Sequence, residues 1–143
     1  CNRYDIRGKD ILSGARKYYV NDLAFREYLT PGFDPGVSRR LENCVFLHYK
    51  AHGYDVHVGA HSGMAVDFVV EKGDVRSYVQ VCYLLADENI IDREYRSLEV
   101  IRDHYPKMVV SMDDVSFGTR NGIHHVSAWD LFCGSGVAGQ LSV

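Results

Sequence analysis

Residues 65–84 read AVDFVVEKGDVRSYVQVCYL, and this stretch decides the fold class of the chain. Ala65–Val70 is rich in β-branched residues, residues 72–74 form a Lys-Gly-Asp turn signal, and Ser77–Leu84 is a second, largely apolar run. A short apolar run of this kind is typical of a strand that is covered on both faces. The stretch therefore predicts two strands, of which the second is central in its sheet.

The flanking sequence predicts helices on both sides of these strands. Upstream, Ser38 is a candidate N-cap, apolar residues recur at helical spacing, and Gly53 ends the pattern before an alternating strand at Tyr54–Val58. Downstream, Asp87 caps a helix that extends to about His104 and is stopped by Pro106. Two further strands and a closing helix follow at Lys107–Met112, Gly122–Val126 and Ser127–Phe132. From residue 38 the predicted order is αβββαβ with a βα tail, which is an α/β fold.

The first 37 residues are less regular. Residues 3–6 and 17–20 are β-rich, and Asp22–Leu29 predicts a short helix. Residues 30–37 hold two prolines and two glycines, which predicts a linker. The chain opens in the middle of a pattern, at Arg3-Tyr4-Asp5-Ile6, so we expect it to be part of a longer protein.

Composition limits the class of protein. The chain has 143 residues, 46% of them hydrophobic, which suits one globular domain with its own core. The formal net charge is −3, so DNA contact requires a local basic patch. The four cysteines are widely spaced, which predicts reduced thiols in the cytoplasm. Neither a signal peptide nor an apolar run long enough to span a bilayer is found, and we expect no membrane partner.

Short motifs carry a resemblance to a known family. In order and spacing the chain resembles the C-terminal domain of prokaryotic AAA+-type ATPases, which has a restriction-endonuclease-like fold with a PD-(D/E)xK motif. The resemblance covers roughly residues 3–132. Its motifs are RYDIRGK at residues 3–9, KYY at 17–19, RLEN at 40–43, GYDV at 53–56, VDFV at 66–69, YVQV at 78–81 and YPK at 105–107.

The resemblance implies a domain organisation. Residues 1–29 correspond to the end of a winged-helix segment, 30–37 to the linker, 38–132 to the restriction-endonuclease-like domain with a mixed sheet flanked by helices, and 133–143 to a tail. The family's nucleotide-binding domain precedes this region. No GxxxxGK[ST] loop occurs in the sequence, so ATP is expected only in the remainder of such a parent protein.

The resemblance also implies a nuclease site. Carried over residue by residue, Glu42 is the helix carboxylate, Asp67 the strand aspartate, Gln80 stands at the glutamate position and Cys82 at the lysine position. Oxygen ligands of this kind suit Mg²⁺ or Mn²⁺, so Glu42, Asp67 and Gln80 are the expected metal ligands. A thiol cannot replace an ammonium at neutral pH, which makes the motif degenerate. Taken without the resemblance, Asp67 and Glu42 also fit a structural carboxylate and a charge that complements the helix dipole.

Three functions follow from this reasoning. The first is a catalytically degenerate domain that helps its parent ATPase bind DNA or another subunit, and homo-oligomers are compatible with it. The second is a metal-dependent DNA nuclease whose lysine has moved to another position. The third is a purely structural interaction domain. A lysine ammonium within reach of Asp67 would favour the enzyme, and the candidates for this lysine are Lys50, Lys72 and Lys107. A basic groove around residues 39–42 would favour DNA binding.

Other motifs fit structural or surface roles better than binding or catalysis. His48 and His52 have the i, i+4 spacing of a zinc pair, but no spacing places a third ligand among His57, His61, His124 and His125. Residues 134–139 match GxGxxG, but they follow a helix rather than a strand. The arginines at 39, 40, 93, 96 and 102 suit phosphates or simply a solvated helix face.

Overall fold

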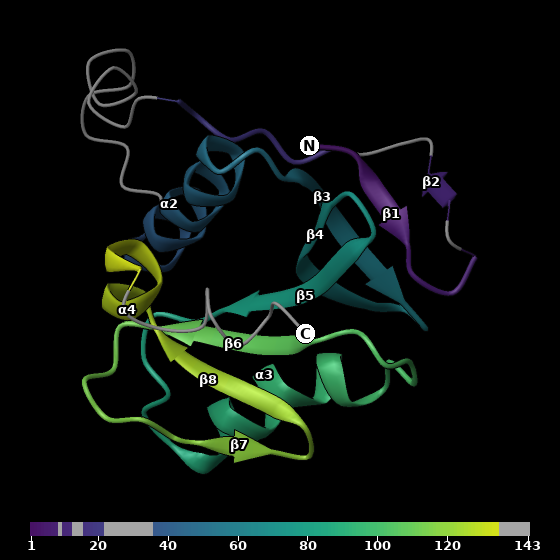
Figure 1. Ribbon diagram of the computed structural model, residues 1–143. Helices are drawn as coiled ribbons and strands as arrows, with labels where there is room; N and C mark the ends of the chain where they lie inside the picture. Colours follow the sequence, from purple (N-terminus) through teal and green to yellow (C-terminus); the bar gives the residue numbers. More distant parts are fainter. Residues whose placement is uncertain (9, 13–15, 22–35, 135–143) are drawn as a thin grey trace.

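The computed structural model describes residues 1–8, 10–12, 16–21 and 36–134. The predicted helix at 22–29, most of the predicted linker and residues 135–143 of the predicted tail lie outside these residues. Within the described part, an eight-stranded mixed sheet is flanked by helices on both faces (Figure 1). This confirms the prediction of an α/β fold.

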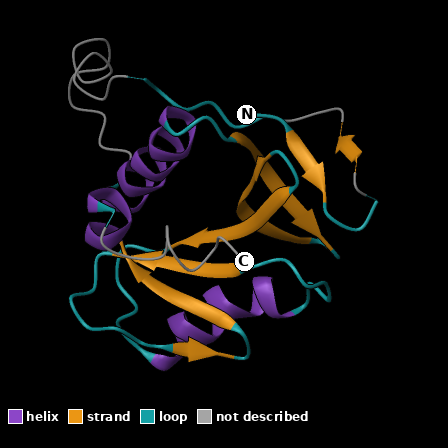
Figure 2. Cartoon of the chain, viewed as in Figure 1, coloured by secondary structure: helices purple, strands orange, loops and turns teal. Residues whose placement is uncertain are grey.

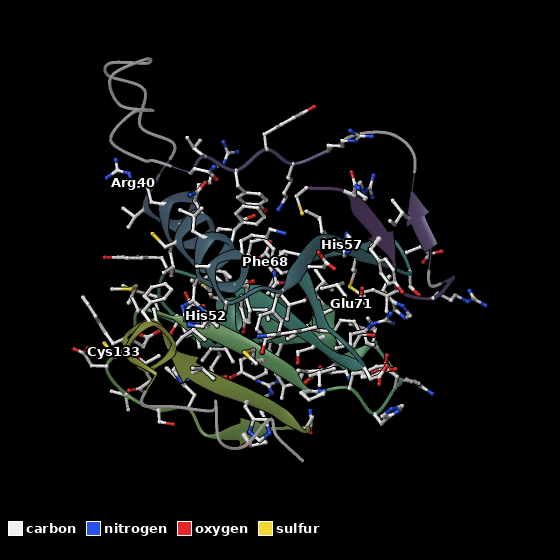
Figure 3. All side chains as sticks on the ribbon, turned by 45° about the horizontal axis from the view of Figure 1, so that its top comes forward. Arg40, His52, His57, Phe68, Glu71 and Cys133 are labelled. Carbon is white, nitrogen blue, oxygen red and sulfur yellow. The ribbon has the colours of Figure 1, made fainter. Side chains whose placement is uncertain are left out.

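Two helices cover the two faces of the sheet. Helix α2 (Val37–Ala51) buries Leu41, Val45 and Tyr49, which lie on one face at i, i+4 and i+8. They pack on the sheet in one core cluster with Phe68, which is labelled beside α2 in Figure 3. Helix α3 (Glu88–Glu99) packs on the opposite face, where the core includes Tyr95 and Leu98 (Figure 2).

The central strands agree with the prediction and are joined by tight hairpins. They are β3 (Asp55–His61), β4 (Met64–Lys72) and β5 (Val75–Val81). Between β3 and β4, Ser62 and Gly63 have φ of 50° and 79°, as a type I′ turn requires. Strands β4 and β5 pair antiparallel, so Phe68 faces Val79 in the register.

The carboxyl half of the chain adds parallel strands. Strand β6 (Lys107–Ser111) pairs parallel with β5, and β8 (Ile123–Ser127) pairs parallel with β6. The short β7 (Thr119–Arg120) closes that edge, and α4 (Ala128–Cys133) follows. From α2 to β6 the order is αβββαβ, as predicted.

Two boundaries differ from the sequence prediction. Helix α2 begins one residue earlier than Ser38, with Gly36 as its N-cap. Asp87 does cap α3, with its side chain accepting from the Ile90 N–H at 2.9 Å, but the helix ends at Glu99 rather than near His104. Asp103 explains the early end, because its side chain accepts bonds from Tyr78 and Lys107 that hold the segment against the sheet.

The amino-terminal segment is part of the same sheet. Strand β1 (Arg3–Asp5) pairs parallel with β3, and β2 (Asp10–Leu12) pairs antiparallel with β1. The β-rich run at 17–20 is extended but belongs to no strand. Residues 16–21, called the strap below, instead run alongside α2 (Figure 1).

Candidate functional site

The strap brings a lysine to the two carboxylates that the sequence singled out. Glu42 lies on the second turn of α2 and Asp67 lies in the middle of β4. Lys17 Nζ is 2.9 Å from Glu42 Oε1 and 3.5 Å from Asp67 Oδ1. The three residues, called the ion cluster below, come from three separate elements, and the fold places them together.

Asp67 is held firmly in this position. Its Oδ2 accepts the Val81 N–H at 3.0 Å, and its own N–H donates to Gln80 Oε1 at 3.2 Å. Burial raises the pKa of Asp67 to about 6, and the charge of Glu42 adds to this, while the Val81 N–H and Lys17 oppose it. Asp67 is therefore largely ionised at neutral pH, although its pKa lies only about one unit below that pH.

Lys17 and Tyr19 share the Glu42 carboxylate. Burial favours a lower pKa for Lys17, but the hydrogen bond to Glu42 and the nearby Asp67 charge outweigh burial and raise that pKa above its ordinary value. The Tyr19 hydroxyl donates to the same Glu42 Oε1 at 2.6 Å. Burial and this bond raise the pKa of Tyr19, so its hydroxyl stays protonated and acts as a donor. The ion cluster thus holds one ammonium against two carboxylates.

Gln80 is committed to other bonds. Its Oε1 accepts from the Asp67 backbone, and its Nε2 donates to Glu94 Oε2 at 3.0 Å. Glu94 is a buried carboxylate of α3, and its Oε1 is paired with Arg93 at 2.7 Å. Sequence reasoning did not single out Glu94 among the acidic residues of this helix, because its burial depends on how α3 packs on the sheet.

Cys82 is placed as an inert thiol. Its Sγ lies 3.2 Å from the Leu84 carbonyl oxygen, and the side chain packs in the core on the α3 face. Burial raises the pKa of Cys82 to about 11, and the Glu94 charge adds to this. The structure therefore gives this residue neither a cation's role nor a nucleophile's role.

The lysine that reaches Asp67 differs from the three considered from the sequence. Lys50 lies 4.0 Å from Asp55, Lys72 donates to the His52 carbonyl oxygen at 2.8 Å, and Lys107 lies 3.4 Å from Asp103. Each of these three lysines lies at the end of a helix or strand and is paired with another group there. Sequence reasoning missed Lys17 because it precedes Glu42 by 25 residues.

The expected metal ligands Glu42, Asp67 and Gln80 are linked to one another through hydrogen bonds of the protein. Both oxygens of Asp67 and the Oε1 of Glu42 and of Gln80 are already bonded to protein donors. Across the described ranges, no group of three or more His, Cys, Asp or Glu side chains is arranged to hold a metal ion. That finding also covers His48 and His52, whose rings lie against each other at 4.3 Å between centroids.

A hollow opens beside the ion cluster. Its volume is about 390 Å³, and it lies between the strap and the first turns of α2. Residues lining it are Lys17, Tyr18, Tyr19, Val20, Arg39, Glu42 and Asn43. Arg16 and Arg40 are exposed next to it in the chain, and Figure 3 shows the Arg40 side chain directed away from α2. Among the described residues, the cations Arg16, Lys17, Arg39 and Arg40 outnumber the carboxylates Glu42 and Asp67 around this hollow, in a chain of net charge −3.

Comparison with known proteins gives a relative without an assigned activity. A protein of Haemophilus influenzae described as "Uncharacterized protein" is 33% identical over 111 residues, which is 78% of this chain. The matched region is 27% of that protein, so the chain spans about a quarter of the relative's length. No family model matches the chain, and no solved structure matches it. None of the helices in the described ranges has the length and apolar character to cross a bilayer.

Proposed function

We propose that this chain is an accessory domain with a restriction-endonuclease-like fold that has lost catalysis and serves in DNA binding. The observation that carries the proposal is Lys17, whose ammonium bridges Glu42 and Asp67 at 2.9 and 3.5 Å. These are the two carboxylates at the positions that the family resemblance assigns to metal ligands. A cation supplied by the chain itself takes the place where a divalent metal would be needed.

The remaining motif positions support loss of catalysis. Hydrolysis of a phosphodiester needs a metal to activate water and to neutralise the phosphate. Here Gln80 is neutral and bonded on both sides, and Cys82 is a buried neutral thiol. Glu42 Oε1 and both carboxylate oxygens of Asp67 accept hydrogen bonds from donors of the protein. The residues as placed therefore do not fit a divalent ion.

DNA binding is supported by the charge around the hollow. Arg16, Arg39 and Arg40 are exposed there, while Lys17 compensates part of the negative charge of the ion cluster. Arginine is well suited to phosphate, because its guanidinium group can donate two parallel hydrogen bonds. This is the local basic patch around residues 39–42 that a chain of negative net charge requires.

One observation favours a second function. Lys17 lies within 3.5 Å of Asp67, which is the contact expected if the catalytic lysine of a nuclease has moved to another element. In that alternative the chain is a divalent-metal-dependent DNA nuclease, and Lys17 leaves the carboxylates when metal binds.

Calorimetric titration with Mn²⁺ separates the two functions. We expect no binding by the unmodified chain at millimolar metal, and we expect Lys17→Met to gain binding. Removing the ammonium releases two carboxylates, and a gain of about tenfold in affinity corresponds to about 1.4 kcal/mol. Asp67→Ala combined with Lys17→Met should lose this binding again. Lys50→Met is the matched control, since Lys50 is an exposed lysine on the same helix as Glu42.

The nuclease alternative predicts the opposite pattern. The unmodified chain would then bind Mn²⁺ and cleave plasmid or single-stranded DNA, and Lys17→Met would still bind metal but lose cleavage. Metal binding by the unmodified chain that disappears in Asp67→Ala, together with cleavage, would overturn the degenerate assignment.

The wider context is part of the proposal. We infer a cytoplasmic parent protein with an AAA+-type ATPase domain, which would be the first partner of this domain, and self-association is compatible with it. The relative's greater length supports a domain within a longer protein. Limited proteolysis and ATPase assays on that longer protein would test the assignment directly.

A further inference from the structure

Tyr18 is an exposed aromatic residue on a segment that is otherwise fixed. Its exposed fraction is 86%, the highest among the large hydrophobic and aromatic side chains of the described residues. An exposed ring indicates a binding site only when its segment is held in place. The strap is anchored on both sides of Tyr18. The position of this ring is therefore set by its neighbours.

Three anchors hold the strap on α2. Lys17 is bound by the two carboxylates, and the Tyr19 ring stacks on Phe46 at 4.3 Å between centroids. Val20 and the buried Asn43 exchange two hydrogen bonds, from Val20 N–H to Asn43 Oδ1 at 2.9 Å and from Asn43 Nδ2 to the Val20 carbonyl at 2.8 Å. Lys17 and Tyr19 both contact α2, and the Tyr18 ring between them stays exposed while it lines the hollow.

The ring stands next to groups that suit phosphate. Tyr18 and Arg39 both line the hollow of about 390 Å³, one from the strap and one from α2. Arg16 is the exposed residue two positions before Tyr18. An aromatic face beside arginines is the combination by which proteins bind single strands, because the ring stacks on a base while the cations meet the backbone.

We infer that the hollow binds single-stranded nucleic acid, with a base stacked on Tyr18 and the adjoining phosphates at Arg39 and Arg16. This inference rests on the proposed DNA-binding function and specifies its ligand. A duplex keeps its base faces stacked inside the helix, so only an unpaired base can offer a face to Tyr18. The site is small, so we expect it to engage a few nucleotides, with an affinity that falls as salt rises.

Fluorescence anisotropy with a labelled 12-nucleotide oligothymidylate and a duplex of equal length tests the inference. We expect the single strand to bind more tightly than the duplex, and Tyr18→Ala to weaken the single-strand affinity by about tenfold, as is usual for loss of one stacked base. Tyr18→Phe keeps the ring and should keep the affinity. Tyr83→Ala is the matched control, since Tyr83 is an exposed tyrosine in the β5–α3 loop, away from the strap. Arg39→Ala should weaken binding of both oligonucleotides and reduce the salt dependence.

The outcomes separate the inference from the function on which it rests. Binding of DNA that is unchanged by Tyr18→Ala, or that favours the duplex, overturns the stacking site and leaves DNA binding in place. Absence of binding to both oligonucleotides overturns the DNA-binding function together with the inference. Circular dichroism of each variant shows whether the fold is retained, and Tyr18 has no buried contact whose loss should disturb it.

Discussion

Two of the polar clusters among the described residues differ in how deeply they are buried. One is the ion cluster of Lys17, Glu42 and Asp67. The other, called the serine cluster here, joins Ser111 at the end of β6 to Asp113 and to His125 of β8. Ser111 is fully buried, whereas Lys17 and Glu42 of the ion cluster line the hollow under the strap.

The serine cluster contains the residue types of a hydrolase triad, but its hydrogen bonds run in the opposite direction. Phe117 N–H donates to His125 Nδ1 at 3.3 Å, so the ring proton is on Nε2 and is shared with Ser111 Oγ at 2.8 Å. The Ser111 hydroxyl then donates to Asp113 Oδ2 at 2.7 Å. In a triad, histidine takes the serine proton, but here it donates to serine. Residue types alone therefore do not identify a functional cluster. The direction of the hydrogen bonds and the access of solvent distinguish the serine cluster from a catalytic triad.

The largest expected effect is a loss of stability when the serine cluster is disrupted. Ser111→Ala removes the acceptor for the His125 Nε2–H and for the Asp113 N–H, as well as the donor to Asp113 Oδ2. Buried groups left unsatisfied cost about 1–3 kcal/mol each, so we expect a loss of about 2–4 kcal/mol in the free energy of unfolding, measured by urea denaturation. Oligonucleotide binding at the hollow should be unchanged. The control is Ser116→Ala at an exposed serine, and equal stability of the two variants would contradict a structural role for the serine cluster.

Acid should affect the two clusters in opposite directions. The folded pKa of Asp67 is about 6, above its ordinary 3.8, so the contribution of this residue to stability is complete below about pH 4 and is lost as pH rises through about 6. Burial lowers the pKa of His125 below its ordinary value, and Asp113 opposes this only in part. The contribution of His125 is therefore present above pH 6.5 and is lost as pH falls through its folded pKa.

Two variants test this opposition. Asp67→Asn should gain stability relative to the unmodified chain as pH rises from 4.5 to 7.5, by on the order of 2 kcal/mol, because the cost of ionising a buried carboxyl is removed. His125→Gln should show the opposite trend and lose relative stability over the same range. Urea denaturation at several pH values measures both slopes. Slopes of the same sign would mean that one of the two clusters is not titrating as its surroundings require.

The sequence predicted the layers of the fold better than the contents of the site. Periodicity located α2, α3 and the central strands, because each buries a regular apolar face that local sequence encodes. Glu42 and Asp67 were brought together as the resemblance implied. Lys17 and Glu94 could not be found in this way, because their roles depend on where the strap and α3 settle on other elements. The sequence also suggested no pairing of β1 with β3, which is a contact between residues more than 50 positions apart.

The smallest predicted effect tests whether the ion cluster extends across the sheet to α3. Gln80 links the Asp67 backbone to Glu94, and the Glu94 charge is one of the influences that raise the pKa of Asp67. Glu94→Gln keeps an acceptor for Gln80 but removes the charge, so the pKa of Asp67 should fall. Stability should change by less than about 1 kcal/mol, since the ion-pair partner Arg93 is solvent-exposed.

Carboxyl carbon NMR of Asp67 measures this shift directly. Asp92→Asn is the matched control, because it removes a carboxylate from the same helix that is paired with Arg120 and has no link to Gln80. A pKa of Asp67 that moves in Glu94→Gln and stays fixed in Asp92→Asn would make Glu94 a positioning residue of the ion cluster. An unchanged pKa in both variants would confine that cluster to the α2 face, and Gln80 would then serve only to satisfy the Asp67 backbone and the buried Glu94. The contrast between the clusters would then rest on the strap, which supplies the ammonium of Lys17 to the two carboxylates.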